Sequence, residues 1–116
     1  MWLFCKQGFF SVVRHSHRPG HLLVRARLAE DADNLARLLA EQTGRPFAPL
    51  VTPDADYRYR LEVPREDFAR AMVRLVEDVD YPNFKLAVHG DAQRDRAYGR
   101  VWSVMAELQE DETAPG

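Results

Sequence analysis

The chain has 116 residues, the length of a single domain, and a formal net charge of −2, close to neutral. Hydrophobic residues make up 46% of the chain and charged residues 29%, as in ordinary globular proteins. This composition excludes a collagen-like chain, a disulfide scaffold and a fully disordered chain. The sequence also lacks the fingerprints of a phosphate-binding loop, a zinc site or a nucleophile elbow.

Two absences in the sequence bear on the compartment of the protein. Cys5 is the one cysteine, so no intrachain disulfide can form, as is usual in a reducing compartment. No apolar run approaches the roughly 20 residues that a membrane span needs, and the first residues lack the order of a signal peptide. We therefore expect a cytoplasmic protein with no membrane partner.

Aromatic and β-branched residues predict strands over 2–5 and 9–15. A turn is predicted at 18–21, because Pro19 and Gly20 suit its second and third positions. A further strand is predicted over 21–28, and we expect it to form a hairpin with the strand over 9–15.

The middle of the chain reads as a helix followed by a strand. Acidic residues in the first turn and Gly44 at the end predict a helix over 30–43. Prolines make 45–56 a loop, or an edge strand at most. Alternation then predicts a strand over 57–63, one face of which carries Tyr57, Tyr59, Leu61 and Val63.

Two helices are expected in the C-terminal part. Pro64 opens the first, and Pro82 should end it near Tyr81. The second covers 92–109. The acidic residues 110–116 are expected to form a flexible tail, which gives one domain over 1–109.

This order of elements predicts an α+β fold, a two-layer sandwich with a mostly antiparallel sheet and helices on one face. The segments 21–28, 30–43 and 57–63 form a right-handed βαβ crossover by default. If strand 9–15 lies between the two parallel strands, the sheet has the split βαβ arrangement of ferredoxin-like folds.

The charge is distributed unevenly along the chain. Residues 1–27 hold five basic side chains and no acidic one, and residues 28–116 hold 11 basic and 18 acidic side chains. The near-neutral total is therefore the sum of +5 and −7, and it does not exclude an anionic partner.

The parity of the predicted hairpin assigns residues to sheet faces. An even-length loop at Pro19 and Gly20 places Arg14 opposite Arg25, and puts Val13, Val24, Ala26 and His15 on the helix side. The open face then carries two apolar residues and five arginines that we take as candidate binding residues: Phe10, Val12, Arg14, Arg25, Arg27, Arg58 and Arg60.

An arginine-lined sheet face favours an anionic counterpart, because the guanidinium group binds phosphate or carboxylate through two hydrogen bonds. We expect a non-enzymatic binding module that forms a homo-oligomer or binds an acidic partner through this face. Single-stranded nucleic acid is the first alternative, and a small ferredoxin-like hydrolase or nuclease is the second. Neither a metal nor another cofactor is expected, because His15 and His17 lack a third ligand at suitable spacing.

The turn after the second helix supplies secondary candidates. Tyr81, Asn83 and Lys85 either shape this turn or present polar groups to a ligand. His89 lies between two helical segments, where it is either a general acid or base or an ordinary surface histidine.

Several segments together carry a resemblance: Met1-Trp2-Leu3-Phe4, Gly8-Phe9-Phe10-Ser11-Val12-Val13 and Asp80-Tyr81-Pro82-Asn83-Phe84-Lys85. Over nearly its whole length the chain resembles a family of small uncharacterised bacterial proteins with this order of segments. The resemblance implies no known activity. It does direct attention to the strand with Arg25 and Arg27, to the Tyr81–Lys85 turn and to Trp102.

Overall fold

The structure, a computed structural model, describes residues 1–113. The chain divides into two compact units, Met1–Asp80 and Tyr81–Gly116, and each is described by itself. The expected single domain over 1–109 therefore stays a prediction.

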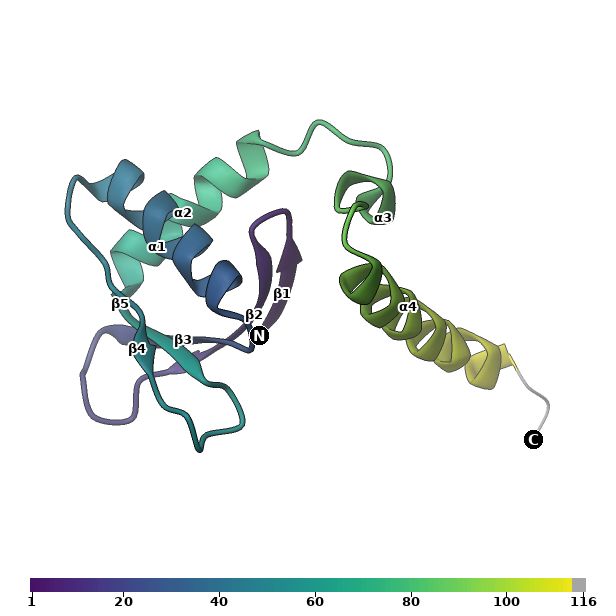
Figure 1. The fold of residues 1–116 in the computed structure, drawn as a ribbon, viewed down its shortest axis with the longest axis horizontal. Helices are drawn as coiled ribbons and strands as arrows, with labels where there is room; N and C mark the ends of the chain where they lie inside the picture. The colour runs from purple at the N-terminus through teal and green to yellow at the C-terminus, as the bar shows by residue number, and fades with distance from the viewer. Residues whose placement is uncertain (114–116) are drawn as a thin grey trace. The chain divides into compact units, whose positions relative to one another are not determined.

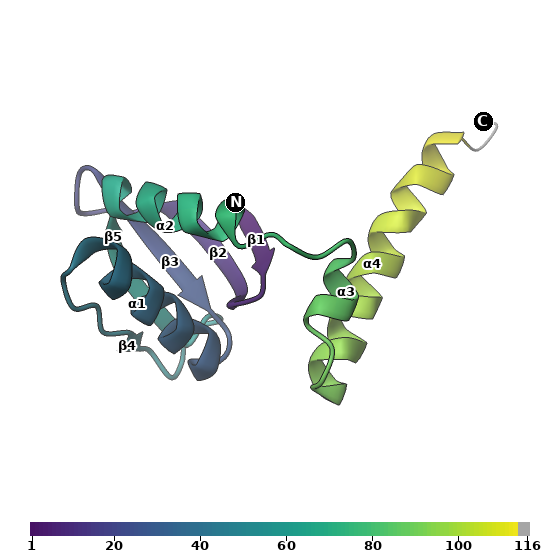
Figure 2. The same ribbon diagram turned by 90° about the horizontal axis from the view of Figure 1, so that it is seen from above.

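The first unit is an α+β sandwich of two layers, as predicted. Its sheet has the strand order β1-β2-β3-β5-β4, and every neighbouring pair is antiparallel. Helices α1 and α2 lie side by side over one face of this sheet (Figures 1 and 2). The elements in chain order are β1 (Trp2–Cys5), β2 (Gly8–Arg14), β3 (His21–Ala26), α1 (Ala29–Thr43), β4 (Leu50–Val51), β5 (Tyr59–Pro64) and α2 (Arg65–Glu77).

The connection through α1 differs from the expected one. β3 and β5 are antiparallel neighbours, with Val24 opposite Leu61, so the predicted parallel pairing of these strands is wrong. The short strand β4 is antiparallel to β5 and hence runs parallel to β3. The strand inserted between two parallel strands is therefore β5, and not strand 9–15 as the ferredoxin-like arrangement required. β4 is a two-residue edge strand in the proline-rich segment, where the sequence had allowed an edge strand at most.

The core lies between the sheet and the two helices. Phe10, Val24 and Val63 of the sheet are at most 2% exposed, and Leu35 and Leu39 of α1 close over them. α2 adds an apolar stripe to the same cluster. Burial of this apolar surface, at roughly 25 cal/mol per Å², is the main stabilising contribution to the unit.

The turn between β1 and β2 is tied to the start of α1. The backbone N–H of Phe9 donates to the Asp31 carboxylate at 3.1 Å, and Asn34 Nδ2 donates to the Gln7 carbonyl at 3.1 Å. Gly8 has a φ of +145°, and a Cβ at this position would lie 2.2 Å from Asp31 Cγ. The turn thus requires glycine, for its backbone angle and for the space that Asp31 fills.

Helix α2 begins with a second buried carboxylate. Asp67 is 3% exposed and forms an ion pair with Arg45, which follows α1 in the sequence. This pairing compensates the burial of its charge. The helix ends at Glu77, before the predicted end near Tyr81.

The second unit contains α3 (Phe84–Ala87) and α4 (Ala92–Thr113). The short helix α3 was not predicted, and it packs on α4 through the stacked rings of Phe84 and Tyr98. Residues 110–113 of the expected tail are helical, and residues 114–116 lie outside the described residues. No helix formed by residues 1–113 is long and apolar enough to cross a bilayer.

Candidate binding face

The loop between β2 and β3 decides which side chains lie on the second face of the sheet. The N–H of His15 donates to the His21 carbonyl at 3.0 Å, so the loop 16–20 has an odd number of residues. Compared with the even-length loop expected from the sequence, an odd-length loop exchanges the two faces of β2. Ser11, rather than Phe10, therefore shares a face with Arg25, its direct neighbour across the pair.

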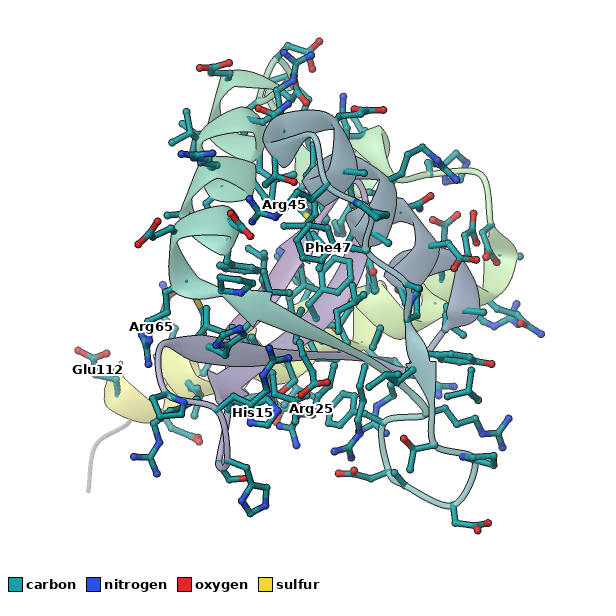
Figure 3. All side chains as sticks on the ribbon, turned by 90° about the vertical axis from the view of Figure 1, so that its left-hand side faces the viewer. His15, Arg25, Arg45, Phe47, Arg65 and Glu112 are labelled. Atoms are coloured by element: carbon teal, nitrogen blue, oxygen red, sulfur yellow. The ribbon has the colours of Figure 1, made fainter. Side chains whose placement is uncertain are left out.

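Within the first unit, this second face carries no helix. Figure 3 shows Arg25 and His15 on this side of the sheet, and Arg45 and Phe47 on the helix side. We call the following set the arginine–aromatic face: Trp2, Phe4, Phe9, Ser11, Arg25, Arg27, Tyr57 and Arg60.

Several face assignments from the sequence are wrong for β2. Phe10 and Val12, expected on the open face, are 1% and 6% exposed in the core. Arg14 lies opposite Leu22 at the end of the sheet, and not opposite Arg25. His15, expected on the helix side, lies on the opposite side with Glu62. The predictions for β3 are confirmed, because Val24 and Ala26 are buried in the core.

Two arginines face each other at the centre of this surface. Arg25 on β3 lies directly opposite Arg60 on β5, a like-charge pair that destabilises a sheet unless something compensates it. Arg25 Nη2 donates to Ser11 Oγ at 2.7 Å, and the buried Nε of Arg25 has no hydrogen-bond partner. This guanidinium group therefore has unused donor capacity.

The Tyr57 ring packs against the guanidinium groups of two of these arginines. The guanidinium carbons of Arg25 and Arg27 lie 4.7 Å and 4.2 Å from the centre of its ring, and each such contact contributes about 0.5–1 kcal/mol. The Tyr57 ring is 5% exposed. It was predicted to share a face with Tyr59, but β5 begins only at Tyr59, and Tyr57 turns to the arginine side.

The acidic residues of the first unit leave most of the positive charge of these arginines uncompensated. Asp56 Oδ1 lies 3.7 Å from Arg60 Nη2, and the Asp56 side chain is 68% exposed. Arg27 donates only to the backbone carbonyl of Asp56. Within residues 1–113, Arg25 and Arg27 form no ion pair. Arg58, which was also expected on this face, is exposed and precedes β5.

A row of aromatic rings continues from the arginines. Phe9 stacks on Phe4 at 4.5 Å and meets Trp2 edge-on at 6.0 Å, and its ring lies 6.5 Å from that of Tyr57. Trp2 is 71% exposed. We missed this row in the sequence because the wrong parity of β2 put Phe10 on the face in place of Phe9.

His15 and Glu62 form a pair at the end of the same face. His15 Nε2 lies 2.5 Å from Glu62 Oε2, and His15 Nδ1 accepts the backbone N–H groups of His17 and Arg18, both at 3.0 Å. Because Nδ1 is an acceptor, Nε2 carries the proton and donates to Glu62. Both ring nitrogens are thus engaged in shaping the loop, and Glu62 also faces Arg18 at 3.7 Å.

The secondary candidates lie in the second unit, where they have structural contacts. Asn83 caps α3 by accepting the Leu86 N–H at 3.1 Å. The Tyr81 ring lies 6.0 Å from Phe84. Lys85 Nζ lies 4.7 Å from the centre of the Trp102 ring. Each of these contacts helps to shape the turn.

His89 has an acidic neighbour. Its Nδ1 lies 2.7 Å from Asp95 Oδ2, and its side chain is 73% exposed. A carboxylate at this position can orient a histidine for general acid–base chemistry. Residues 1–113 contain no group of three metal-ligating side chains.

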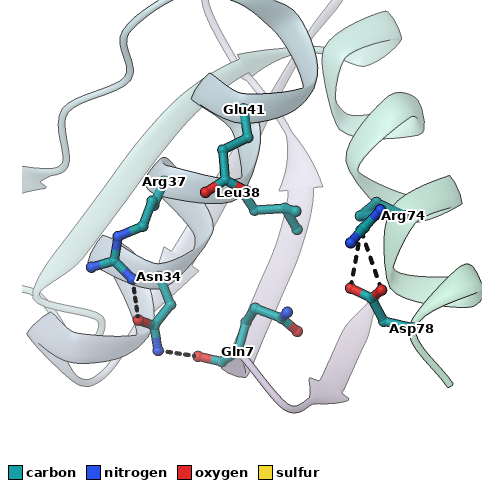
Figure 4. A pocket seen from close by; sticks show the side chains of 7 residues that line it. All are labelled: Gln7, Asn34, Arg37, Leu38, Glu41, Arg74 and Asp78. Carbon is teal, nitrogen blue, oxygen red and sulfur yellow. Dashed lines mark hydrogen bonds and ion pairs between the residues drawn. The ribbon is translucent and has the colours of Figure 1, made fainter. Parts of the chain in front are cut away.

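A polar pocket of about 280 Å³ opens between α1, α2 and the β1–β2 turn (Figure 4). Much of its polar lining is already paired: Arg74 with Asp78, Arg37 with Asn34, and Asn34 with the Gln7 carbonyl. Of these contacts, Asn34–Gln7 joins α1 to the β1–β2 turn, and the other two lie within α1 and at the end of α2.

Cys5 is 8% exposed, and its thiol donates to the Gly8 carbonyl at 3.6 Å. Burial raises the pKa of this thiol, which reduces its thiolate fraction and its reactivity. The cysteine therefore belongs to the core rather than to a redox site.

Comparisons of the chain with known protein families, with curated proteins and with solved structures find no match. The family resemblance noted from the sequence stays a prediction. Any functional proposal must therefore start from the arginine–aromatic face itself.

Proposed function

We propose that this protein is a cytoplasmic binding module that engages an anionic partner through the arginine–aromatic face. The observation that carries the proposal is the pair of Arg25 and Arg60, which oppose each other across two strands while Arg25 has no carboxylate partner within residues 1–113. An anion at this point relieves the repulsion between the two guanidinium groups.

Single-stranded nucleic acid is the class of partner that fits this face best. Its phosphates match Arg25, Arg27 and Arg60, and its bases match the exposed ring of Trp2, which borders the half-buried rings of Phe4 and Phe9. Sheet surfaces that bind single strands combine these two features, stacking bases on aromatic side chains and pairing phosphates with cations. The carboxylates of an acidic protein segment pair with the arginines but do not stack on the aromatic rings.

The test is the binding of a fluorescently labelled oligothymidine to the full chain, followed by fluorescence anisotropy at low salt. We expect binding that weakens with increasing salt, because cations are released from the phosphates. The Arg25→Ala/Arg27→Ala variant should weaken binding at least tenfold and reduce the slope of log K against log salt by about 1–2.

A matched control is available on α2. Arg65 and Arg70 are exposed there, away from the arginine–aromatic face, so Arg65→Ala/Arg70→Ala removes the same charge elsewhere. This variant should bind nearly as the original chain does. Equal losses in both double variants, or no binding at low salt, would contradict the proposal.

The aromatic row distinguishes nucleic acid from an acidic protein. Trp2→Ala should weaken oligothymidine binding roughly tenfold, since stacking on one base is worth about 1–3 kcal/mol. It should leave the affinity for polyglutamate unchanged. If polyglutamate binds as tightly as oligothymidine and Trp2→Ala has no effect on either, the partner is an acidic protein segment instead.

A further inference from the structure

An apolar stripe runs along α4 and is open to solvent. Its residues follow the i, i+3, i+4, i+7 spacing of one helix face, and their exposed fractions range from 40% to 59%. Large apolar side chains gathered on one exposed face mark an interaction surface. The stripe consists of Val101, Val104, Met105 and Leu108.

The contacts with α3 leave this stripe uncovered. α3 reaches α4 through Phe84, stacked on Tyr98 at 6.1 Å, and through Lys85, which lies over Trp102. At 100° per residue, Tyr98 and Trp102 fall at one edge of the stripe rather than along its centre. The second unit thus does not bury its own apolar face.

The charges of α4 run against the dipole of the helix. Three arginines and one acid lie in its first half, at Arg94, Asp95, Arg96 and Arg100. Its last turns, from Glu107 to Glu112, carry four acidic residues and no basic one. A helix is stabilised by the opposite arrangement, with acids at its N-terminus and bases at its C-terminus.

A second α4 in antiparallel orientation compensates both features at once. The acidic end of each helix then lies beside the basic half of the other, and each apolar stripe faces its own copy. Because both copies contribute the same surface, the contact closes with twofold symmetry and does not propagate.

We propose that two copies of this chain associate through α4, antiparallel, with the twofold axis between Val104 and Met105. This register places Val101 against the partner's Leu108 and Val104 against the partner's Met105. Arg96 and Arg100 fall beside the acidic segment 110–112 of the partner. The surface lies in the second unit and is independent of the arginine–aromatic face.

Sedimentation velocity of the full chain tests the association. We expect the average mass to rise from monomer towards dimer with increasing protein concentration in the micromolar range, and to fall when salt is added. Met105→Glu places a charge in the centre of the stripe and should weaken the dimer at least tenfold. A chain that stays monomeric throughout this range overturns the proposal.

Ser103→Glu is the matched control, because Ser103 is exposed on the opposite side of α4 and gains the same charge. It should dimerise as the original chain does, with both variants checked for unchanged helix content by circular dichroism. An equal loss of dimer in the two variants would show that the stripe is not the contact.

The orientation is tested with single cysteines under mild oxidation by oxidised glutathione. Copies with Ala97→Cys mixed with copies carrying Glu112→Cys should form a disulfide-linked heterodimer, because this register brings the two positions together. Glu112→Cys copies alone should remain unlinked, and Cys5 does not compete because it is buried. Rapid cross-linking of Glu112→Cys with itself would indicate parallel helices and overturn the antiparallel contact.

Discussion

Gly8 shows how a single residue connects the sheet to the helix layer. Its φ of +145° lies where residues with a side chain are strained, and the Asp31 carboxylate occupies the place of its missing Cβ. The same carboxylate accepts the N–H of Phe9 at 3.1 Å. Gly8 therefore supports the buried Asp31 and the position of Phe9 on the arginine–aromatic face.

We expect Gly8→Ala to destabilise the protein strongly. Forcing a methyl group into a filled site costs about 1–3 kcal/mol, in addition to a backbone strain of about 1–3 kcal/mol. Urea unfolding of the full chain measures the change. Gly20→Ala is the control, because Gly20 also has a positive φ of 75° but nothing within 4 Å of its missing Cβ. Similar losses in the two variants would mean that the contact with Asp31 is unimportant.

At the scale of elements, the His15–Glu62 pair fixes the hairpin of β2 and β3 against β5. The imidazole accepts two backbone N–H groups of the loop and donates to a side chain on another strand. The loop therefore wraps around the histidine ring, and its conformation depends on a contact with a residue far away in the sequence. The contact lies at the end of the hairpin in which Ser11 is opposite Arg25.

We expect Glu62→Ala to lower the free energy of unfolding by about 1.5–3 kcal/mol, the worth of a hydrogen bond to a charged group. The measurement is urea unfolding of the full chain, with Asp54→Ala as a control for removing an exposed acid from a loop. A Glu62→Ala variant as stable as Asp54→Ala would show that the pair contributes little.

The same hairpin shows what the sequence could predict and what it could not. Strand and helix positions followed from alternation, from helical spacing and from acids at helix starts, and all the longer elements of the first unit were found near their predicted ranges. The faces of β3 were also right. The faces of β2 were wrong, because the chemistry of Pro19 and Gly20 indicates a turn but does not count the residues in the loop.

The candidate site was predictable only in part for the same reason. Arg25, Arg27 and Arg60 were placed on one face because alternation within a strand does not depend on the loop. Their aromatic neighbour Phe9 depends on the parity of β2 and was missed. Tyr57 was misplaced because the chain before β5 leaves the strand geometry.

At the scale of the whole molecule, the charge of −2 separates between the two units. The first unit holds 12 basic and 12 acidic residues, and the second holds 4 basic and 6 acidic ones. The net charges of the two units therefore hide local charge on two surfaces. One face of the sheet has an excess of cations, and α4 has two oppositely charged halves. The cationic sheet face favours an anionic partner, and the charge separation along α4 favours a second copy of the chain.

The hydrophobic core predicts that the first unit folds alone. All the residues of its buried cluster, from Cys5 to Leu75, lie within residues 1–80. A fragment of residues 1–80 should therefore unfold cooperatively, with a Tm within about 4 °C of the full chain, a shift that corresponds to roughly 1 kcal/mol. Circular dichroism with heating measures this.

A shorter fragment provides the control for this experiment. Residues 1–64 lack α2, and with it Phe68, Ala71 and Leu75 of the buried cluster. Losing three buried apolar side chains removes several kcal/mol, at roughly 1.5–3 kcal/mol for a large one. That is a large part of the roughly 5–15 kcal/mol that stabilises a domain, so this fragment should be unfolded. If residues 1–80 are unfolded as well, the stability of the sheet depends on the second unit, and the two units form one cooperative domain.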